Sequence, residues 1–291
     1  MRQIKAMFYL IFSIICSVSV GIIFKISRRY EISMRQIVAW NYVIALTLCY
    51  LFYNPEPGTL SSSAPWGIYV TLGLLMPSIF LILAASVKHM GIVKTDAAQR
   101  LSLFLPLLAS WLLFGEHFVP LRILGLVVGF AAIVLILFKT EKEPGKTPAL
   151  LYPVLVFIGF GLIDVLFKQI AQILIIPYTT SLVMVFCISF IVSLLGVAYL
   201  IFIKKEKFQF INFICGCILG FFNFGNILFY LKAHKALASE PSTVFTTMNM
   251  GVIILGSLVG IFIFKERLNK LNYIGLFMAL AAIVFITLSS K

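Results

Sequence analysis

The sequence predicts an all-α membrane protein: a polytopic bundle of ten transmembrane helices made of two inverted five-helix repeats. Three observations predict this fold, namely the composition, the apolar segments and an internal repeat. Of the 291 residues, 62% are hydrophobic and only 11% are charged, and the mean hydropathy is +1.09. A soluble domain is about half apolar and about a quarter charged. The composition therefore excludes a soluble globular protein.

Nearly the whole chain divides into apolar segments close to the about 20 residues that a helix needs to cross a bilayer. The expected spans are residues 7–26, 36–53, 66–87, 97–115, 121–138, 150–170, 178–203, 210–231, 242–264 and 271–289. Five spans precede and five follow a charged stretch that contains proline and glycine, as domain linkers do. We therefore expect a first repeat at 1–140, a linker at 141–149 and a second repeat at 150–291.

The internal repeat covers the end of one span and the start of the next. Residues 114–134 recur without a gap, 150 positions later, as 264–284. Glu116 is matched by Glu266, and the run Ala-Ala-Ile-Val at 131–134 is matched at 281–284. Duplication explains this register better than composition does. Because each copy has an odd number of spans, the second enters the membrane from the opposite side, so the repeat is inverted.

The net charge of +13 comes from basic residues in short loops between apolar segments, where they set orientation and meet lipid headgroups. We expect no nucleic-acid partner. Of the 23 lysines and arginines, 16 lie on the side opposite the termini. The positive-inside rule then places the termini outside, although basic residues within the membrane should not be counted.

These features resemble the drug/metabolite transporter superfamily, in particular its EamA-type members with ten spans. The resemblance covers essentially the whole chain and rests on the units at Glu116 and Glu266, on Pro106 within span four, and on the Phe-Lys ends of spans one and six, Phe24-Lys25 and Phe167-Lys168. It implies a central cavity between the halves and export of small metabolites such as amino acids. It also implies cytoplasmic termini, against the charge count, so the orientation stays open.

Ionisable residues inside a membrane are costly unless they are paired or face water, so they indicate function. Asp164 and Lys168 in span six are spaced i, i+4, as are Asp96 and Arg100 at the start of span four. Each pair is expected to be either an internal ion pair or part of the transport site. Asp164 lies deeper than Asp96 and is a candidate proton-binding group. Together with Lys25, residues Asp164, Lys168 and Arg100 form our set of coupling or intramembrane charges.

Polar side chains mark the expected substrate site. Asn223, Asn226 and Tyr230 form a stripe on span eight that must face another helix or a cavity. Thr246 and Asn249 of span nine and Asn41 of span two are further candidates. Gly251, Gly256 and Gly260 are expected to allow close helix packing. We read the three histidines as loop residues and expect no metal or cofactor.

Glu116 and Glu266 lie at the ends of spans on opposite membrane faces, so they cannot act on one bond. We assign them a structural role, at the junction between their two helices. No enzyme motif such as H-E-x-x-H or G-x-S-x-G is present, so we expect no enzymatic activity. The sequence thus favours a secondary transporter in a bacterial inner membrane, a monomer or weak dimer, with protons as the possible coupling ion. The alternative is a lipid-handling protein, either a scramblase or an intramembrane transferase.

Overall fold

The computed structural model describes residues 2–29, 33–53, 55, 64–137, 151–174, 176–265 and 270–289, and at some helical positions, Lys25 among them, only the backbone. These residues form ten helices and no strand. The helices are α1 (Arg2–Arg29), α2 (Met34–Tyr53), α3 (Trp66–Leu101), α4 (Phe104–Leu112), α5 (Pro120–Leu137), α6 (Leu151–Gln172), α7 (Tyr178–Phe202), α8 (Phe210–Ala236), α9 (Pro241–Phe262) and α10 (Lys270–Leu288).

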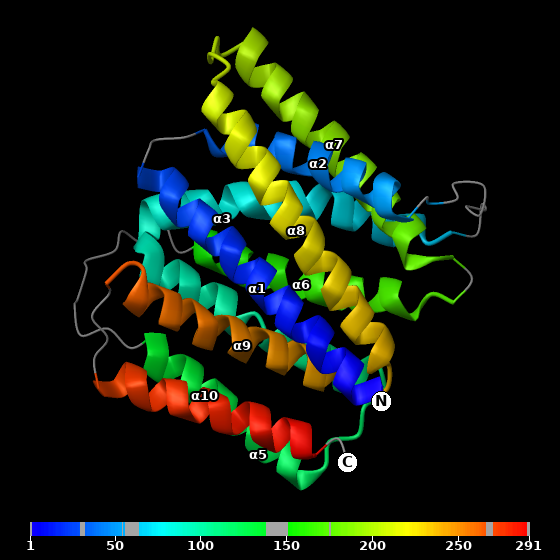
Figure 1. Cartoon of the computed structure of the whole chain (residues 1–291), viewed down its shortest axis with the longest axis vertical. Coiled ribbons are helices and arrows are strands. Elements are labelled where there is room, and N and C mark those ends of the chain that lie inside the picture. The colour runs from blue at the N-terminus through cyan, green and yellow to red at the C-terminus, as the bar shows by residue number, and fades with distance from the viewer. Residues whose placement is uncertain are drawn as a thin grey trace.

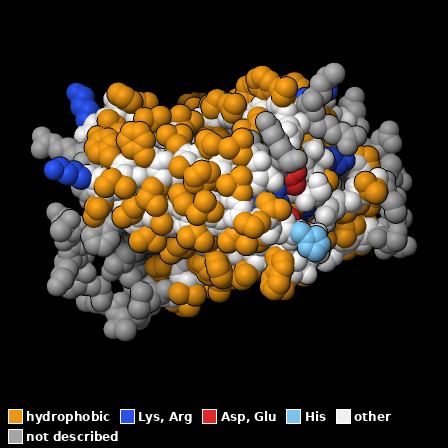
Figure 2. All heavy atoms as spheres, turned by 90° about the horizontal axis from the view of Figure 1, so that it is seen from below, with side chains coloured by type: hydrophobic (Ala, Val, Ile, Leu, Met, Phe, Trp, Pro, Cys, Tyr) orange, Lys and Arg blue, Asp and Glu red, His pale blue; other side chains and the backbone are white. Residues whose placement is uncertain are grey.

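Seven of the described helices contain an apolar stretch long enough to cross a membrane, and α5 and α10 contain shorter ones, Pro120–Leu135 and Lys270–Ile286. The prediction of an all-helical, multi-pass bundle is thus confirmed. Figure 2 shows apolar side chains over most of the face on the α5 and α10 side. Val127 of α5 and Phe277 of α10 are 61% and 71% exposed, as expected for side chains that face lipid.

The sequence predicts separate spans at 66–87 and 97–115, whereas residues 66–101 form one continuous helix, α3. In a straight helix, Ser86 and Thr95 would lie about 13 Å apart along the axis. Their hydroxyl oxygens are 2.6 Å apart. α3 therefore bends sharply between these residues and the chain reverses while it stays helical (Figure 1). Residues 88–96 contain no proline that would remove a backbone donor, and the helix is interrupted only before α4.

The helices pack in pairs that join the two halves. α5 packs on α10, α1 on α8, α3 on α6, and α2 on both α7 and α8. In Figure 1, α5 and α10 lie side by side at one edge, and both termini lie at one end of the bundle. We call this the terminal end, and the opposite end, where α1 finishes and α6 begins, the distal end.

Two glycines of α8 bring it close to α2. A Cβ added to Gly220 would lie 2.6 Å from the backbone oxygen of Asn41, and one added to Gly216 would collide with Trp40. Gly216 and Gly220 form a G-x-x-x-G pair, a frequent device for close helix packing in membranes. On α9, Gly251 packs directly on Ile14 of α1, whereas a Cβ at Gly256 would meet nothing within 4 Å.

Candidate functional site

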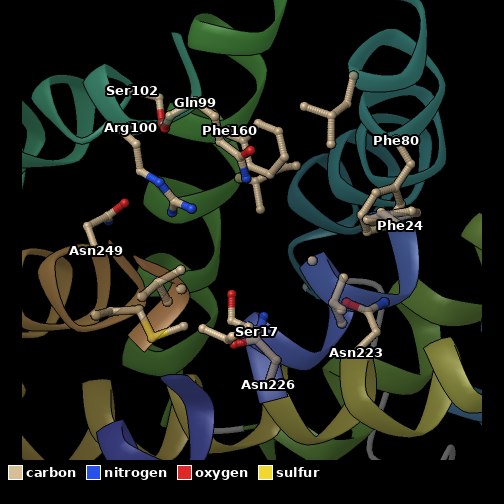
Figure 3. Close-up of a pocket in the computed structure, with 18 of the residues that line it drawn as sticks. Ser17, Phe24, Phe80, Gln99, Arg100, Ser102, Phe160, Asn223, Asn226 and Asn249 are labelled. Carbon is tan, nitrogen blue, oxygen red and sulfur yellow. The ribbon is translucent and has the colours of Figure 1, made fainter. Parts of the chain in front are cut away.

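A cavity of about 420 Å³ lies between the two halves of the chain. Its walls come from α1, α3, α6, α8 and α9, and from Ser102 just after α3. Most of the lining is apolar, and Figure 3 shows the rings of Phe24, Phe80 and Phe160 on its walls. Pockets of this size that combine apolar walls with a few polar groups are typical of small-molecule sites.

The cavity occupies the middle of the bundle and extends toward the distal end. Its lining on α1 extends from Ser17 to Phe24, and on α9 from Met248 to Gly260, followed by Phe264. Both helices begin at the terminal end, so the lining residues of α1 lie in its second half, and those of α9 run from near its middle to its distal end. Along α1 and α9 the cavity therefore reaches toward the distal end, whereas Phe167 of α6 and Tyr230 of α8 mark its limit nearer the terminal end.

Two charged side chains, Arg100 and Asp164, occur among the described lining residues. In Figure 3 the Arg100 side chain points from the end of α3 into the cavity, with Ser17 and Asn226 across from it. Asp164 of α6 accepts a hydrogen bond from the Tyr230 hydroxyl of α8, at 2.9 Å. The cavity thus offers a guanidinium and a carboxylate beside aromatic walls. The side chain of Asp96, which the sequence pairs with Arg100, lies outside the described residues.

The polar stripe of α8 lines the cavity and also bonds to neighbouring helices. Asn223 donates a hydrogen bond to the Asn41 side-chain oxygen of α2 at 3.0 Å. Ser13 of α1 donates to the Asn226 side-chain oxygen at 2.8 Å, and Tyr230 reaches Asp164. Because all three also border the cavity, both sequence-based interpretations of the stripe describe part of the geometry.

The remaining substrate candidates are placed differently. Asn249 lines the cavity but also donates to the backbone oxygen of Phe245 on its own helix, at 3.0 Å. Asn41 and Thr246 are fully buried and lie outside the lining. Asn41 faces α8, and the Thr246 hydroxyl has no hydrogen-bond partner among the described groups.

Lys168 is not paired with Asp164. Its ammonium is completely buried and donates to the backbone oxygen of Ala238, after α8, at 2.8 Å. Lys168 therefore bonds to the chain between α8 and α9 and does not border the cavity. The side chain of Lys25 and all of Glu266 lie outside the described residues.

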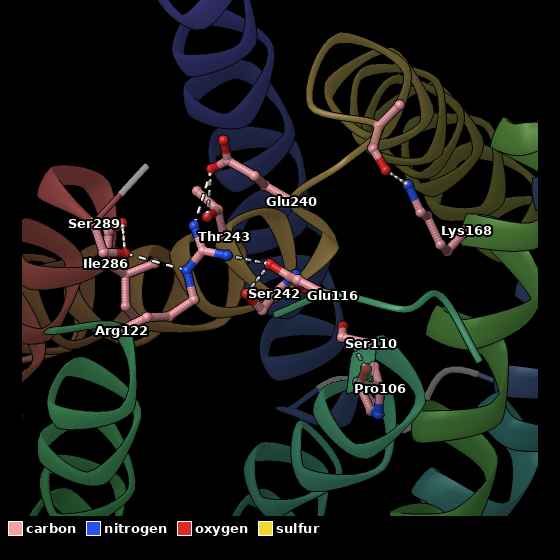
Figure 4. A network of polar contacts seen from close by, with 11 residues as sticks. Pro106, Ser110, Glu116, Arg122, Lys168, Glu240, Ser242, Thr243, Ile286 and Ser289 are labelled. Atoms are coloured by element: carbon pink, nitrogen blue, oxygen red, sulfur yellow. Dashed lines mark hydrogen bonds and ion pairs between the residues drawn. The ribbon is translucent and has the colours of Figure 1, made fainter. Parts of the chain in front are cut away.

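Glu116 lies in a buried network at the terminal end (Figure 4). Its carboxylate accepts hydrogen bonds from the Ser242 backbone N–H at 2.9 Å and from the Ser242 hydroxyl at 2.6 Å. Ser242 lies in the first turn of α9, where the helix dipole favours a negative charge. Glu116 therefore reaches across to the other half of the chain as well as joining its own two helices.

Arg122 of α5 completes this network. It forms ion pairs with Glu116 and, at 3.2 Å, with Glu240, and its Nε donates to Ser289 after α10. Burial raises the pKa of the Glu116 carboxyl, whereas the hydrogen bonds from Ser242 and the charge of Arg122 act in the opposite direction. Removing one partner of a buried ion pair strongly destabilises a protein, because the other charge is left buried without compensation. The network therefore fixes α5, α9 and the end of α10 to one another.

Sequence reasoning missed several of these groups. Gln99, Ser17 and Ser102 line the cavity, but single polar residues near helix ends give no periodic signal. Arg122 falls at the start of an apolar span and resembles a loop cation. The expectation that His234 is a loop residue is wrong, because it is fully buried between Tyr230 and Phe245.

A bundle of apolar helices around a cavity with a few convergent polar groups is typical of a multi-pass membrane protein with a small-molecule site. The model of the EamA-like transporter family matches residues 4–138, and the chain belongs to this family. An uncharacterized protein of Haemophilus influenzae is 40% identical over 284 residues, which cover 94% of this chain and 95% of that protein. A protein of known crystal structure shares the fold, with a TM-score of 0.73 at 14% identity, over 97% of this chain and 96% of that one.

Proposed function

We propose that the protein is a secondary transporter that exports small metabolites such as amino acids by alternating access around the central cavity. The observation that carries this proposal is the presence of Arg100 and Asp164 in one cavity with aromatic walls. A guanidinium binds a carboxylate well, and a carboxylate binds an ammonium group. An amino acid carries both groups, and its side chain would lie against Phe24, Phe80 and Phe160.

The packing supports an inverted repeat of two five-helix halves, divided at the 141–149 linker. Exchanging the halves exchanges the α1–α8 contact with the α6–α3 contact, and both are present. The α5–α10 and α2–α7 contacts map onto themselves, and both are present too. Inverted repeats with a site at their interface are a common basis of alternating access. We place the protein in a bacterial inner membrane, as a monomer or weak dimer.

The test is substrate binding and flux with purified protein. Thermal stabilisation by a panel of amino acids and of their decarboxylated amines identifies ligands, because a ligand that binds the native state raises its stability. Arg100→Gln should weaken binding of the amino acid by about tenfold or more but leave the matching amine unaffected. Arg35→Gln is the control, since Arg35 forms an exposed ion pair with Glu206, outside the cavity.

Equal weakening of amino-acid binding and amine binding by Arg100→Gln would contradict recognition of the carboxylate by Arg100.

Asp164 is our candidate for proton coupling, because it is an intramembrane carboxylate that borders the cavity. In proteoliposomes, Asp164→Asn should abolish flux driven by a pH gradient, while exchange of substrate for substrate persists at substrate concentrations high enough to offset the lost ammonium contact. Unchanged pH-driven flux would exclude this role.

A further inference from the structure

A second hollow, of about 340 Å³, lies at the terminal end, where α1, α7 and α8 meet. Its lining includes three lysines, Lys5 of α1 and Lys232 and Lys235 of α8, together with Tyr9 and Tyr178. None of its described lining residues is acidic, and within the described part of the chain these lysines form no ion pair. Three gathered ammonium groups without a carboxylate favour an anionic ligand.

Two of the three ammonium groups are held in place by aromatic rings. Lys232 donates a hydrogen bond to the Tyr53 hydroxyl at 3.0 Å, and its ammonium lies 5.4 to 5.8 Å from the ring centroids of Tyr53, Phe229 and Tyr9. The Lys235 ammonium lies 4.7 Å from the ring centroid of Tyr178. Cation–π attraction fixes these groups but leaves their charge uncompensated. Lys232 and Lys235 are therefore held in position beside the hollow, and Lys5 lies exposed at its rim.

The hollow continues into an apolar surface that faces lipid. Lys5, Phe8, Tyr9 and Phe12 are spaced i, i+3, i+4 and i+7, so they share one face of α1. Phe8 and Phe12 are 57% and 50% exposed, and the Phe12 ring stacks on Phe229 at a centroid distance of 5.2 Å. A ligand with an anionic head and an apolar tail can contact the lysines and this stripe together, whereas a free anion uses the lysines alone.

We propose that this hollow binds the phosphate group of an anionic membrane lipid, whose acyl chains lie along the apolar face of α1. Basic side chains at a membrane surface attract anionic headgroups. Each contributes a modest binding free energy, and the contributions of a cluster add together. The tyrosine hydroxyls supply further donors for phosphate oxygens. The site is separate from the central cavity, so this proposal does not depend on the proposed transport function.

The experiment measures lipid bound to the full-length protein purified in detergent. Native mass spectrometry and thermal unfolding are recorded with phosphatidylglycerol, with phosphatidylcholine and with inorganic phosphate. We expect phosphatidylglycerol to be retained and to raise the unfolding midpoint. The variant K5Q/K235Q keeps Lys232, which the aromatic rings hold in place, and should bind phosphatidylglycerol about thirtyfold more weakly. The matched control K204Q/K207Q removes two exposed lysines at the distal end and should bind as the unchanged protein does.

Three results would overturn the proposal. Equal phosphatidylglycerol binding by K5Q/K235Q and K204Q/K207Q would show that Lys5 and Lys235 do not bind the lipid. Equal stabilisation by phosphatidylcholine or by inorganic phosphate would show that no anionic lipid is recognised. Glu56 is the one acidic residue of the 54–63 segment, and E56Q should leave lipid binding unchanged. A large gain in E56Q would show that the chain's own carboxylate occupies the hollow.

Discussion

At the scale of single residues, the end of each repeated helix depends on an unusual backbone conformation. Gly115 and Lys265, which are equivalent in the two copies, have φ angles of 63° and 54°. Lys205, at the end of α7, has a φ of 55°. Each of the three directly precedes a glutamate. The left-handed conformation ends a helix without cost when glycine adopts it, but it strains a residue with a Cβ.

This conformation predicts opposite effects for substitutions at the two equivalent positions. Gly115→Ala should destabilise the protein by about 1 kcal/mol, since a Cβ there would meet no atom within 4 Å and only the φ of 63° opposes it. Lys265→Gly should stabilise by about 1 kcal/mol because it removes the same strain. Reversible unfolding in mixed micelles measures both changes.

Gly196→Ala is the matched control, because Gly196 lies inside α7, has an ordinary φ and also meets nothing within 4 Å. Alanine there should be neutral or slightly stabilising, since glycine is a poor helix former. Destabilisation by Lys265→Gly would contradict the strain argument.

The contact between Asn41 and Asn223 also belongs to this scale, because it can separate packing from substrate binding. If Asn223 serves packing, Asn41→Ala and Asn223→Ala should destabilise by amounts that are not additive, with a coupling of about 0.6 kcal/mol. If Asn223 also binds substrate, Asn223→Ala should weaken ligand affinity while Asn41→Ala should not, since Asn41 lies outside the cavity. Unfolding and ligand titration of the two single variants and the double variant measure both effects.

The sequence could predict the stripe of Asn223, Asn226 and Tyr230, because helical periodicity is a property of one segment. It could not predict their partners, because Asn41, Ser13 and Asp164 come from three other helices and only packing brings them together. The same reason explains why the i, i+4 spacing of Asp164 and Lys168 did not predict the partners of these two side chains. Spacing allows an ion pair, but each side chain finds a better partner on α8 or just after it.

At the scale of helices, glycines set how closely α8 approaches α2. Gly220→Ala should destabilise by about 1 to 3 kcal/mol, because the new Cβ would lie 2.6 Å from a backbone oxygen that cannot move alone. Gly196→Ala again serves as control. Stability and near-ultraviolet circular dichroism in detergent check this expectation, and an unchanged midpoint in Gly220→Ala would show that the two helices separate easily.

At this scale the sequence could predict that the helices exist, but it could not predict one boundary between two of them. Apolar segments of about 20 residues specify where helices lie, and the described helices fall on them. The join between spans three and four was misjudged, because the sequence shows a polar interruption at 88–96 but not how the backbone crosses it. A sharp bend within α3, closed by the Ser86–Thr95 hydrogen bond, reverses the chain without a loop.

At the scale of the whole molecule, the two ends of the bundle differ. The cavity reaches toward the distal end through Phe24 and Phe264. At the terminal end, Glu116, Arg122, Glu240 and Ser242 join α5 to the start of α9. A transporter that works by alternating access must break such a closure when the cavity opens to the other side. In the proposed mechanism this network belongs to one state and helps to set the population of that state.

Removing Arg122 should therefore shift the protein toward a state open at the terminal end. Breaking a buried ion pair costs about 3 to 5 kcal/mol in the state that contains it, and each 1.4 kcal/mol changes a population about tenfold.

Met248 lines the cavity near its inner limit on α9. In a protein without native cysteines, a cysteine at this position should react with a membrane-impermeant maleimide from the distal side. The further change Arg122→Gln should raise its labelling from the terminal side by about tenfold or more. Arg35→Gln, which removes an exposed distal ion pair, should leave both rates unchanged. If Arg122→Gln unfolded the protein, labelling would rise equally from both sides, and it would rise as well in a control variant whose single cysteine is the buried native Cys49. The network would then hold the fold together without setting which end is open.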